Sequence, residues 1–508
     1  MIRAISLFCL LLCLCLGGPA HAQGPAANAF DMDALATVQT EAIDFMLPRT
    51  LEVVTAAQLA MWGLGGLTTI DPTLGAVLKD TTIQLQVRGR SVREVAVAGP
   101  DAGSWAQAAA KIVAAAYAAS PVMRGTGQAG ITKMLFDEML AHLDPYSRYI
   151  PPIEAVDDRD RRVGHAGIGV MLARHGRSVT VRDVVIGSPG ALAGIVPGDV
   201  IQWVDGRSAL NHDTRAVDAM LNGPEGTELR MSWLNHDGTS RGATLTRVMI
   251  PPETVFPRRE GDIEIVQITG FSQTTDQHVI QVIRDSLRGA RPMSGIILDL
   301  RGNRGGLVRA AVATANTFLP AGVIMRSAGR APETNRVWLS GGGEMAKDVR
   351  VVVLVDGGTA SAAEILAAAL ADRGRAVVVG SSTFGKGVVQ TIDPLPDGGE
   401  LFLTWSRILA PRGWPIQSLG VMPQVCTSLG EDAVRRQLDG LAAGRLEMDA
   451  AVKASRAARA PLSPDQIVAI REPCPAADPR DSDVAVARSV LESPGFNAAL
   501  FGLMPEER

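Results

Sequence analysis

The chain has few aromatic residues and no excess of positive charge. Phe, Trp and Tyr together make up 4% of its 508 residues, and the formal net charge is -4. Nucleic-acid-binding proteins commonly present a basic surface and aromatic platforms for base stacking. We therefore expect no nucleic acid among the partners of this protein. The other proportions, 46% hydrophobic and 20% charged residues, are ordinary for a globular protein with a sizeable core.

Cysteine is also scarce, and three of the five cysteines lie near the N-terminus, within residues 1–22. There Arg3 precedes a short apolar run, and Ala20-His21-Ala22 fits the small-x-small cleavage pattern of a secretory signal peptide. The segment predicts an exported protein, periplasmic or otherwise extracytoplasmic, with an uncleaved signal that anchors it to the membrane as the alternative. Cleavage would leave Cys426 and Cys474, either as a disulfide or as two buried thiols.

Histidine and lysine are rare as well, which narrows the choice of a general base. All seven histidines lie at or before His278, and no Cys, His and Asp cluster has the spacing of zinc ligands. We therefore expect no metal and no cofactor, and a Ser-His-Asp hydrolase is disfavoured. Only six lysines accompany 43 arginines. Arginine carries almost all of the positive charge and would be expected wherever only a charge is needed. A lysine in a motif therefore indicates a role that arginine cannot fill.

Hydrophobic patterning divides the chain into five parts. A signal peptide (1–22) precedes a helical N-terminal region (23–160), a β-rich unit (161–252), an α/β core (253–426) and a helical C-terminal region (427–508). In the core, apolar β-branched runs alternate with helical stretches, which predicts strands buried on both faces. These runs are Ile296–Leu300, Val351–Val355 and Ala376–Val379. The expected fold class is a multidomain combination of α/β and α+β units.

The segment Val351–Leu370 carries the first candidate catalytic residue. A buried strand runs into the turn Asp356-Gly357-Gly358, and Ser361 follows at the expected start of a helix. Free backbone N–H groups and the positive dipole end at a helix N-terminus would stabilise an oxyanion formed beside a nucleophilic serine. On this segment alone, the commoner role of such a serine, an N-cap, is the alternative.

Lys386 is the candidate base for that serine. It stands in Thr383-Phe384-Gly385-Lys386-Gly387, directly after a buried strand. A desolvated lysine can lose its proton, whereas arginine cannot in practice, so Lys386 could act as a general base. Gln390 could hold the lysine amine if the chain continues as a helical turn or returns beside it. The alternatives are a solvated loop lysine and a surface glutamine.

A glycine-rich turn follows another buried strand and precedes the expected helix Leu307–Phe318. It reads Asp299-Leu300-Arg301-Gly302-Asn303-Arg304-Gly305-Gly306. Turns of this kind can direct backbone N–H groups at an anion, so this one could supply an oxyanion donor. It lacks the G-x-x-x-x-G-K-[ST] pattern, which disfavours a nucleotide P-loop.

Together these segments resemble the carboxyl-terminal processing peptidases, the tail-specific proteases of serine peptidase family S41. The serine motif reads TASAAEI at 359–365 and the lysine motif reads TFGKGVVQ at 383–390. A Leu-Asp-Pro segment at 143–149 and the stretch 413–423 extend the resemblance over residues 125–426. Arg304 stands where proline is common and Asp356 where asparagine is common, and neither departure removes a catalytic atom.

The resemblance implies a role for each matched residue. Ser361 would be the nucleophile, Lys386 the base and Gln390 the residue that orients the lysine. The oxyanion hole would be formed by the backbone N–H groups of Ala362 and of Gly305 or Gly306. The core would be related to the crotonase and ClpP folds.

The β-rich unit resembles a PDZ domain, with signatures that include GIGV at 167–170 and SPGALAGIVPGD at 188–199. The resemblance implies that a substrate C-terminus adds as a strand beside Ile168–Leu172 and packs against the helix Asp213–Leu221. The expected peptide-binding residues are Gly167, Ile168, Gly169 and Val170. The expected partners are protein or peptide substrates bound by their C-terminus, and an adaptor protein and a homo-oligomer stay open.

Two other functions are alternatives. A catalytically silent peptide-binding scaffold of the same fold would have no physical reason to keep Ser361, Lys386 and Gln390 together. An acyl-CoA enzyme on a crotonase-type core is disfavoured by the signal segment, because CoA chemistry is expected inside the cell.

Overall fold

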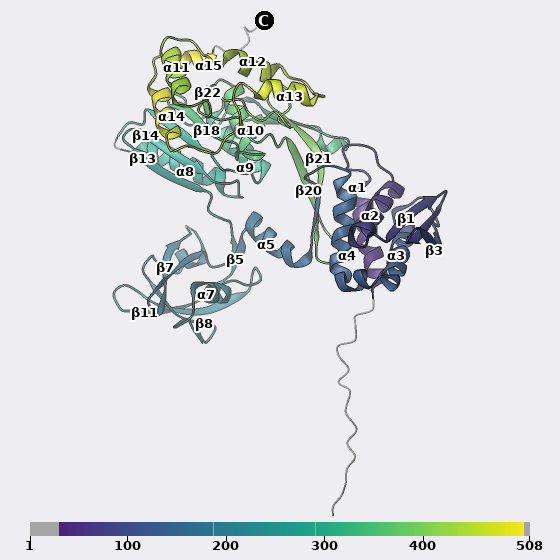
Figure 1. Cartoon of the computed structure of the whole chain (residues 1–508). Coiled ribbons are helices and arrows are strands. Elements are labelled where there is room, and N and C mark those ends of the chain that lie inside the picture. The colour runs from purple at the N-terminus through teal and green to yellow at the C-terminus, as the bar shows by residue number, and fades with distance from the viewer. Residues whose placement is uncertain (1–29, 186, 290, 502–508) are drawn as a thin grey trace, which may run out of the picture.

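The computed structural model describes residues 30–501 apart from residues 186 and 290, and Figure 1 shows the arrangement. The predicted signal peptide, residues 1–22, and its three cysteines lie outside the described residues. Three units are visible: an N-terminal unit, a β-rich unit below the core, and the core itself with the C-terminal helices on top (Figure 1).

A six-stranded sheet forms the centre of the core, in the order β13-β14-β15-β18-β19-β22. From β14 to β22 neighbouring strands are parallel, and β13 pairs with β14 antiparallel. The three predicted apolar runs become the three central strands β15, β18 and β19, in which nearly every residue is buried. The bounds are β13 Val255–Glu260, β14 Ile263–Ile268, β15 Gly295–Asp299, β18 Arg350–Val355, β19 Val377–Gly380 and β22 Val425–Cys426.

Helices cover both faces of this sheet, which explains why its strands are continuously apolar. Helices α8 (Thr275–Arg288), α9 (Val308–Phe318) and α10 (Ala362–Asp372) pack in one hydrophobic cluster with alternate strand residues. The other face packs against the C-terminal helices, so the region to which the sequence assigns no chemistry covers half of the core. These helices are α11 Glu431–Ala442, α14 Asp483–Glu492 and α15 Phe496–Phe501.

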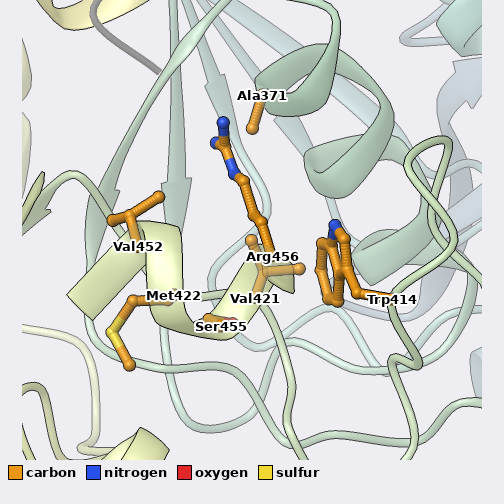
Figure 2. A pocket seen from close by; sticks show the side chains of 7 residues that line it. All are labelled: Ala371, Trp414, Val421, Met422, Val452, Ser455 and Arg456. Atoms are coloured by element: carbon orange, nitrogen blue, oxygen red, sulfur yellow. The ribbon is translucent and has the colours of Figure 1, made fainter. Parts of the chain in front are cut away.

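The C-terminal region is fixed to the core by a disulfide and by a buried ion pair. Cys426, in β22, is bonded to Cys474, and their Cα atoms are 5.9 Å apart. Helix α12 (Asp449–Ala457) directs Arg456 at Asp372, at the end of α10, with Nε 3.2 Å from the carboxylate. Figure 2 shows Arg456 beside Trp414, Val452 and Ala371; the hollow between them is too small to admit water and offers no ligand site. Helix α13 spans Pro464–Arg471.

A second sheet links the core to the N-terminal unit. Its order is β17-β16-β21-β20, and the short strand β4 pairs with β21. The hairpin of β20 and β21 extends out of the core, and three leucines near its tip join the hydrophobic cluster of the N-terminal helices. The bounds are β4 Arg148–Ile150, β16 Gly322–Ala328, β17 Arg336–Ser340, β20 Val388–Pro394 and β21 Glu400–Leu409, with a 3₁₀ turn at Pro332–Thr334.

The N-terminal unit is not purely helical, in contrast to the prediction. Its helices are α1 Met32–Met46, α2 Ala56–Ile70, α3 Ala102–Ala119 and α4 Pro121–Ala141. Between α2 and α3 lies a three-stranded antiparallel sheet of β1 Leu74–Lys79, β2 Thr82–Val87 and β3 Arg90–Ala96. Only alternate residues of β2, Ile83 and Leu85, are fully buried. The signal was this period-2 pattern, which the surrounding Ala- and Leu-rich helices obscured.

The β-rich unit is connected to the core by helix α5 (Pro152–Val163) and a two-stranded ribbon of β5 and β12. Its main sheet has the order β11-β10-β8-β7-β6, so β6 is an edge strand, and helix α7 packs beside it. The predicted helix Asp213–Leu221 is α7 with Asp213 as its N-cap. The bounds are β5 His165–Gly167, β6 Val170–His175, β7 Ser178–Val184, α6 Pro189–Leu192, β8 Val200–Val204, β9 Arg207–Ser208, α7 Thr214–Leu221, β10 Glu228–Leu234, β11 Ser240–Thr246 and β12 Val248–Ile250.

Candidate active site

Three loops meet where the parallel strands β15, β18 and β19 end. Their residues are 300–306, 356–361 and 381–387. Because neighbouring parallel strands end at the same edge of a sheet, this is where an α/β fold builds its sites. The Asp356 carboxylate joins the first two loops: it accepts the Gly302 N–H at 3.0 Å and the Thr359 N–H at 2.8 Å. Asp356, which stands where the resembled family commonly has asparagine, thus accepts hydrogen bonds from both loops.

Ser361 has a strained backbone at the start of α10. Its φ of 57° and ψ of -118° lie in a region that side-chain-bearing residues rarely adopt. Strain of this kind costs on the order of 1–3 kcal/mol and is concentrated at functional sites. The next residue, Ala362, begins the helix, and its N–H has no hydrogen-bond partner within the described part of the chain. Ser361 is therefore presented beside a free donor at the positive end of the helix dipole.

Glu364 connects the nucleophile candidate to the base candidate, a role that the sequence analysis missed. One carboxylate oxygen accepts the backbone N–H groups of Ser361 and Lys386, at 2.7 and 2.9 Å. The other oxygen accepts the Gly385 N–H at 2.7 Å and the Thr383 hydroxyl at 2.5 Å. The side chain is fully buried; burial raises the pKa of this carboxyl, and the four donors oppose that rise. A glutamate three residues after a helix-starting serine is a capping-box signal, which could have identified Glu364.

Replacing Glu364 by glutamine should disorganise the site. An amide can keep its oxygen toward one pair of donors, but its NH2 group then faces the other pair, and two buried donors lose their acceptor. We expect the free energy of unfolding to fall by about 1–3 kcal/mol and the catalytic activity expected of this site to fall at least tenfold. Urea unfolding and steady-state kinetics measure the two effects.

Glu264 offers a matched control. It is also buried and lies in β14, and among the described residues it accepts one side-chain hydrogen bond, from the Ser286 hydroxyl at 2.8 Å. Glu264→Gln should keep its activity, because an amide oxygen can accept that one bond. Wild-type activity in Glu364→Gln would show that the bridge between the two loops is dispensable.

Lys386 is half-buried beside an aromatic ring. Its Nζ lies 5.2 Å from the centre of the Tyr146 ring. Burial lowers the pKa of Lys386, the positive charge of Arg148 lowers it further, and Asp144 and Glu364 raise it. No hydrogen bond joins Lys386 Nζ to Ser361 Oγ in the region of the chain that the structure describes. The lysine is partly desolvated, as a general base requires, and its contact to the serine is not made in this state.

Gln390 lies in strand β20, so the alternative of a helical turn is wrong, and the role of Gln390 in holding the lysine amine stays a prediction. Its Nε2 donates to the Thr404 hydroxyl at 3.0 Å, across the β20–β21 hairpin. Among the described residues it makes no hydrogen bond to Lys386.

The glycine turn lies against Ser361 through Gly305 and contains one free donor. The Gly305 N–H donates to Asn303 Oδ1 at 2.8 Å and is thus occupied. Gly306 is exposed, and over the described ranges its N–H has no partner. A Cβ on Gly305 would lie 2.9 Å from Ser361 Cβ, so only glycine allows this approach. Of the two glycines left open by the sequence, Gly306 has the available N–H group.

The edge of the β-rich unit carries the predicted peptide-binding residues. Gly167 pairs with Val248 in the β5–β12 ribbon, while Val170 begins the edge strand β6. Between them, the N–H groups of Ile168 and Gly169 lack partners in the described part of the molecule. The carbonyl groups of both residues are occupied, by Gly190 and Val185 N–H donors at 2.8 Å. The loop therefore offers donors without competing acceptors, as carboxylate capture requires.

No group of three or more His, Cys, Asp or Glu side chains in residues 30–501, without 186 and 290, could hold a metal ion. In the same ranges no helix combines the length and apolarity needed for a membrane crossing.

Two family profiles and several proteins of known name match this chain. The profile of Peptidase family S41 matches residues 262–427, and that of the PDZ domain matches residues 180–235. A carboxy-terminal-processing protease of Bartonella bacilliformis is 32% identical over 320 residues, covering 59% of this chain and 74% of that protein. The carboxy-terminal processing protease CtpA of Bacillus subtilis is 35% identical over 301 residues, covering 58% of this chain and 63% of that protein.

A solved structure is also similar. The photosystem II D1 C-terminal processing protease is 26% identical, with 76% of this chain and 97% of that chain covered, at a TM-score of 0.36.

Proposed function

The chain belongs to peptidase family S41, and we propose that it is an endopeptidase that cleaves exported proteins with a Ser361–Lys386 dyad after capturing their C-terminal tails. That it is a serine-type peptidase of the CtpA type with a PDZ domain follows from the family. The assignment of the dyad, the help from Gln390, and the tail-bearing substrates are the proposal.

The observation that carries the dyad is the bridge made by Glu364. Because one carboxylate oxygen accepts N–H groups from both Ser361 and Lys386, the two residues are held at one place although 25 positions separate them. The strained φ of Ser361 and the burial of Lys386 support the same assignment. A silent scaffold would need neither feature.

The proposed chemistry proceeds through an acyl-enzyme. Neutral Lys386 takes the proton of the Ser361 hydroxyl while Oγ attacks the peptide carbonyl carbon. The N–H groups of Ala362 and Gly306 receive the oxyanion of the tetrahedral intermediate. The lysine ammonium then protonates the leaving amine, and the same base activates the water that hydrolyses the ester on Ser361.

Substrate capture is proposed at the edge of the PDZ domain. An extended tail would pair with strand β6, and its terminal carboxylate would accept the N–H groups of Ile168 and Gly169. Helix α7 contacts β6 and would form the other wall of the tail-binding site. Half-buried apolar residues of β6, Val170 and Leu172, would contact the side chains of the tail, so an apolar tail is expected.

Export is proposed from the signal-like residues 1–22 and is consistent with the disulfide, since disulfides persist in oxidising compartments. Fractionation of the native host, with detection of the processed chain outside the cytoplasm, tests it. A chain found only in the cytoplasm with its N-terminus intact would refute it.

The experiment for tail capture compares two substrates with wild-type enzyme and Leu172→Glu. One is an unfolded reporter protein ending in several apolar residues, and the other is the same protein ending in aspartates. We expect Leu172→Glu to raise KM for the apolar-tailed reporter roughly tenfold or more, because a charge replaces an apolar contact. Leu339→Glu is the matched control. It introduces the same charge at an exposed position of β17, outside the PDZ domain. Equal processing of both reporters by all three enzymes would reject tail capture.

A further inference from the structure

A loop of the N-terminal unit reaches the strands that carry the active site. It spans residues 143–149, the Leu-Asp-Pro segment, and leads into β4. Strand β4 pairs with β21 in the register Arg148 with Phe402 and Tyr149 with Leu401. The loop is therefore fixed to the strand that also carries Thr404.

Asp144 organises this loop and contacts the active-site hairpin. Its Oδ1 accepts the N–H groups of Tyr146 and Ser147 at 2.8 and 3.0 Å, and its Oδ2 accepts the Ser147 hydroxyl at 2.6 Å. Oδ1 also accepts the Thr404 hydroxyl at 2.8 Å, from a position 260 residues away. The Thr404 N–H in turn donates to the Ser147 hydroxyl at 3.0 Å.

These contacts determine which way the Gln390 amide points. A hydroxyl has one proton, and an ionised carboxylate can only accept, so the Thr404 proton goes to Asp144. The oxygen of the Thr404 hydroxyl must then accept its other contact, which comes from the Gln390 amide at 3.0 Å. The NH2 group of Gln390 is therefore the group that faces Thr404. The amide oxygen is left for another donor.

The same loop surrounds Lys386 with charged and aromatic groups. The Tyr146 ring lies 5.2 Å from its Nζ. The charged groups that act on the lysine are Asp144 and Arg148 from this loop and Glu364 from α10. The N-terminal unit, whose function the sequence leaves open, thus forms one wall of the site.

We propose that Asp144 is a positioning residue of the active site, which acts through Thr404 to turn the amide oxygen of Gln390 toward Lys386. The amide oxygen would accept an N–H of the lysine and hold its amine for proton transfer from Ser361. The inference rests on the proposed Ser361–Lys386 mechanism. It assigns the Leu-Asp-Pro segment a function in catalysis in addition to its place in the fold.

The first test replaces Thr404 by valine and by serine in the full chain. Valine keeps the shape and removes the hydroxyl, so kcat should fall roughly tenfold while KM changes little. Serine keeps the hydroxyl and should restore kcat to within about twofold of wild type. The probe is the unfolded reporter with the apolar tail, and the active fraction is determined with a serine-reactive phosphonofluoridate.

The second test is the pH profile of kcat/KM for Asp144→Asn. Asp144 raises the pKa of Lys386, so loss of its charge should shift the acid limb of the profile to lower pH, together with a lower plateau. Thr404→Val removes no charge and should leave the limb in place. If Asp144 had only a structural role, Asp144→Asn would reduce the fraction of active enzyme. It would change neither the acid limb of the pH profile nor kcat per active site.

Asp71→Asn is the matched control. Asp71 precedes a proline in a similar turn of the same unit, where it accepts the N–H and hydroxyl of Thr73 and the hydroxyl of Ser120. Its replacement should lower stability and leave kcat and the pH profile unchanged.

Wild-type kcat per active site in Thr404→Val, or the same limb shift in Asp71→Asn, would overturn the inference. If Ser361→Ala is inactive while Thr404→Val is fully active, only the positioning role fails. Full activity of Ser361→Ala would instead refute the proposed mechanism itself.

Discussion

Replacing Ser361 by alanine is expected to abolish cleavage of the tailed reporter and to leave the fold intact. The substitution removes Oγ, the only atom that can form the acyl-enzyme, and a loss of roughly 10⁴-fold or more is typical of nucleophile removal. Alanine keeps the Cβ, so the strained backbone at φ 57° and the contact with Gly305 are retained. Cleavage assays and a thermal unfolding curve measure the two parts of the prediction.

Ser418 provides the matched control for this variant. It is also a serine with positive φ, 66°, and lies outside the proposed dyad. Ser418→Ala should therefore retain wild-type turnover. Undiminished cleavage by Ser361→Ala, free of contaminating protease, would refute the nucleophile assignment.

Replacing Lys386 by arginine should be nearly as damaging, although the charge is kept. Arginine cannot give up its proton near neutral pH, so the general base is lost, at a cost of roughly 10²–10⁴-fold or more in kcat. In the wild-type enzyme, kcat/KM should rise with pH as Lys386 loses its proton. Because burial lowers the pKa of Lys386, the midpoint of that rise should lie below the ordinary lysine value of 10.5.

Lys347→Arg is the control, since Lys347 is exposed and precedes strand β18, at the sheet edge opposite the three loops of the candidate site. It should keep wild-type kcat and the same pH profile. Near-normal turnover by Lys386→Arg would show that another group acts as the base.

Ser361 and Lys386 could be located from the sequence because each lies in a loop that follows a buried parallel strand. Val351–Val355 and Ala376–Val379 are apolar throughout, and strands β18 and β19 in the structure nearly coincide with them. Residues that directly follow such strands must lie at one edge of the sheet. The proximity of Ser361 and Lys386 could thus be inferred without their contacts.

Other parts of the site depend on contacts that local patterns do not encode. Glu364 has the appearance of a helix-capping residue, and its bonds to residues 383–386 form only when the third loop folds over α10. The contact of Asp144 with Thr404 spans 260 positions, and the choice between Gly305 and Gly306 depends on one side chain, Asn303. A motif indicates which residues matter and leaves open what they touch.

The N-terminal unit shows the same limit at the level of the fold. Its helices follow from apolar periodicity and from caps such as Thr55 and Asp101. The sheet β1–β3 is mostly exposed, so few apolar residues signal it. That the unit would also supply a wall of the candidate site could not be predicted, because strand β4 joins β21 across about half of the chain.

The most direct test of the central claim is to trap the nucleophile during turnover. The enzyme is treated with a phosphonofluoridate in the presence of an apolar-tailed peptide, and the modified residue is identified by mass spectrometry. We expect one adduct, on Ser361, with activity lost in proportion to labelling, and much slower labelling in Lys386→Arg. Full inactivation with the adduct on another residue, or full activity with Ser361 labelled, would contradict the account.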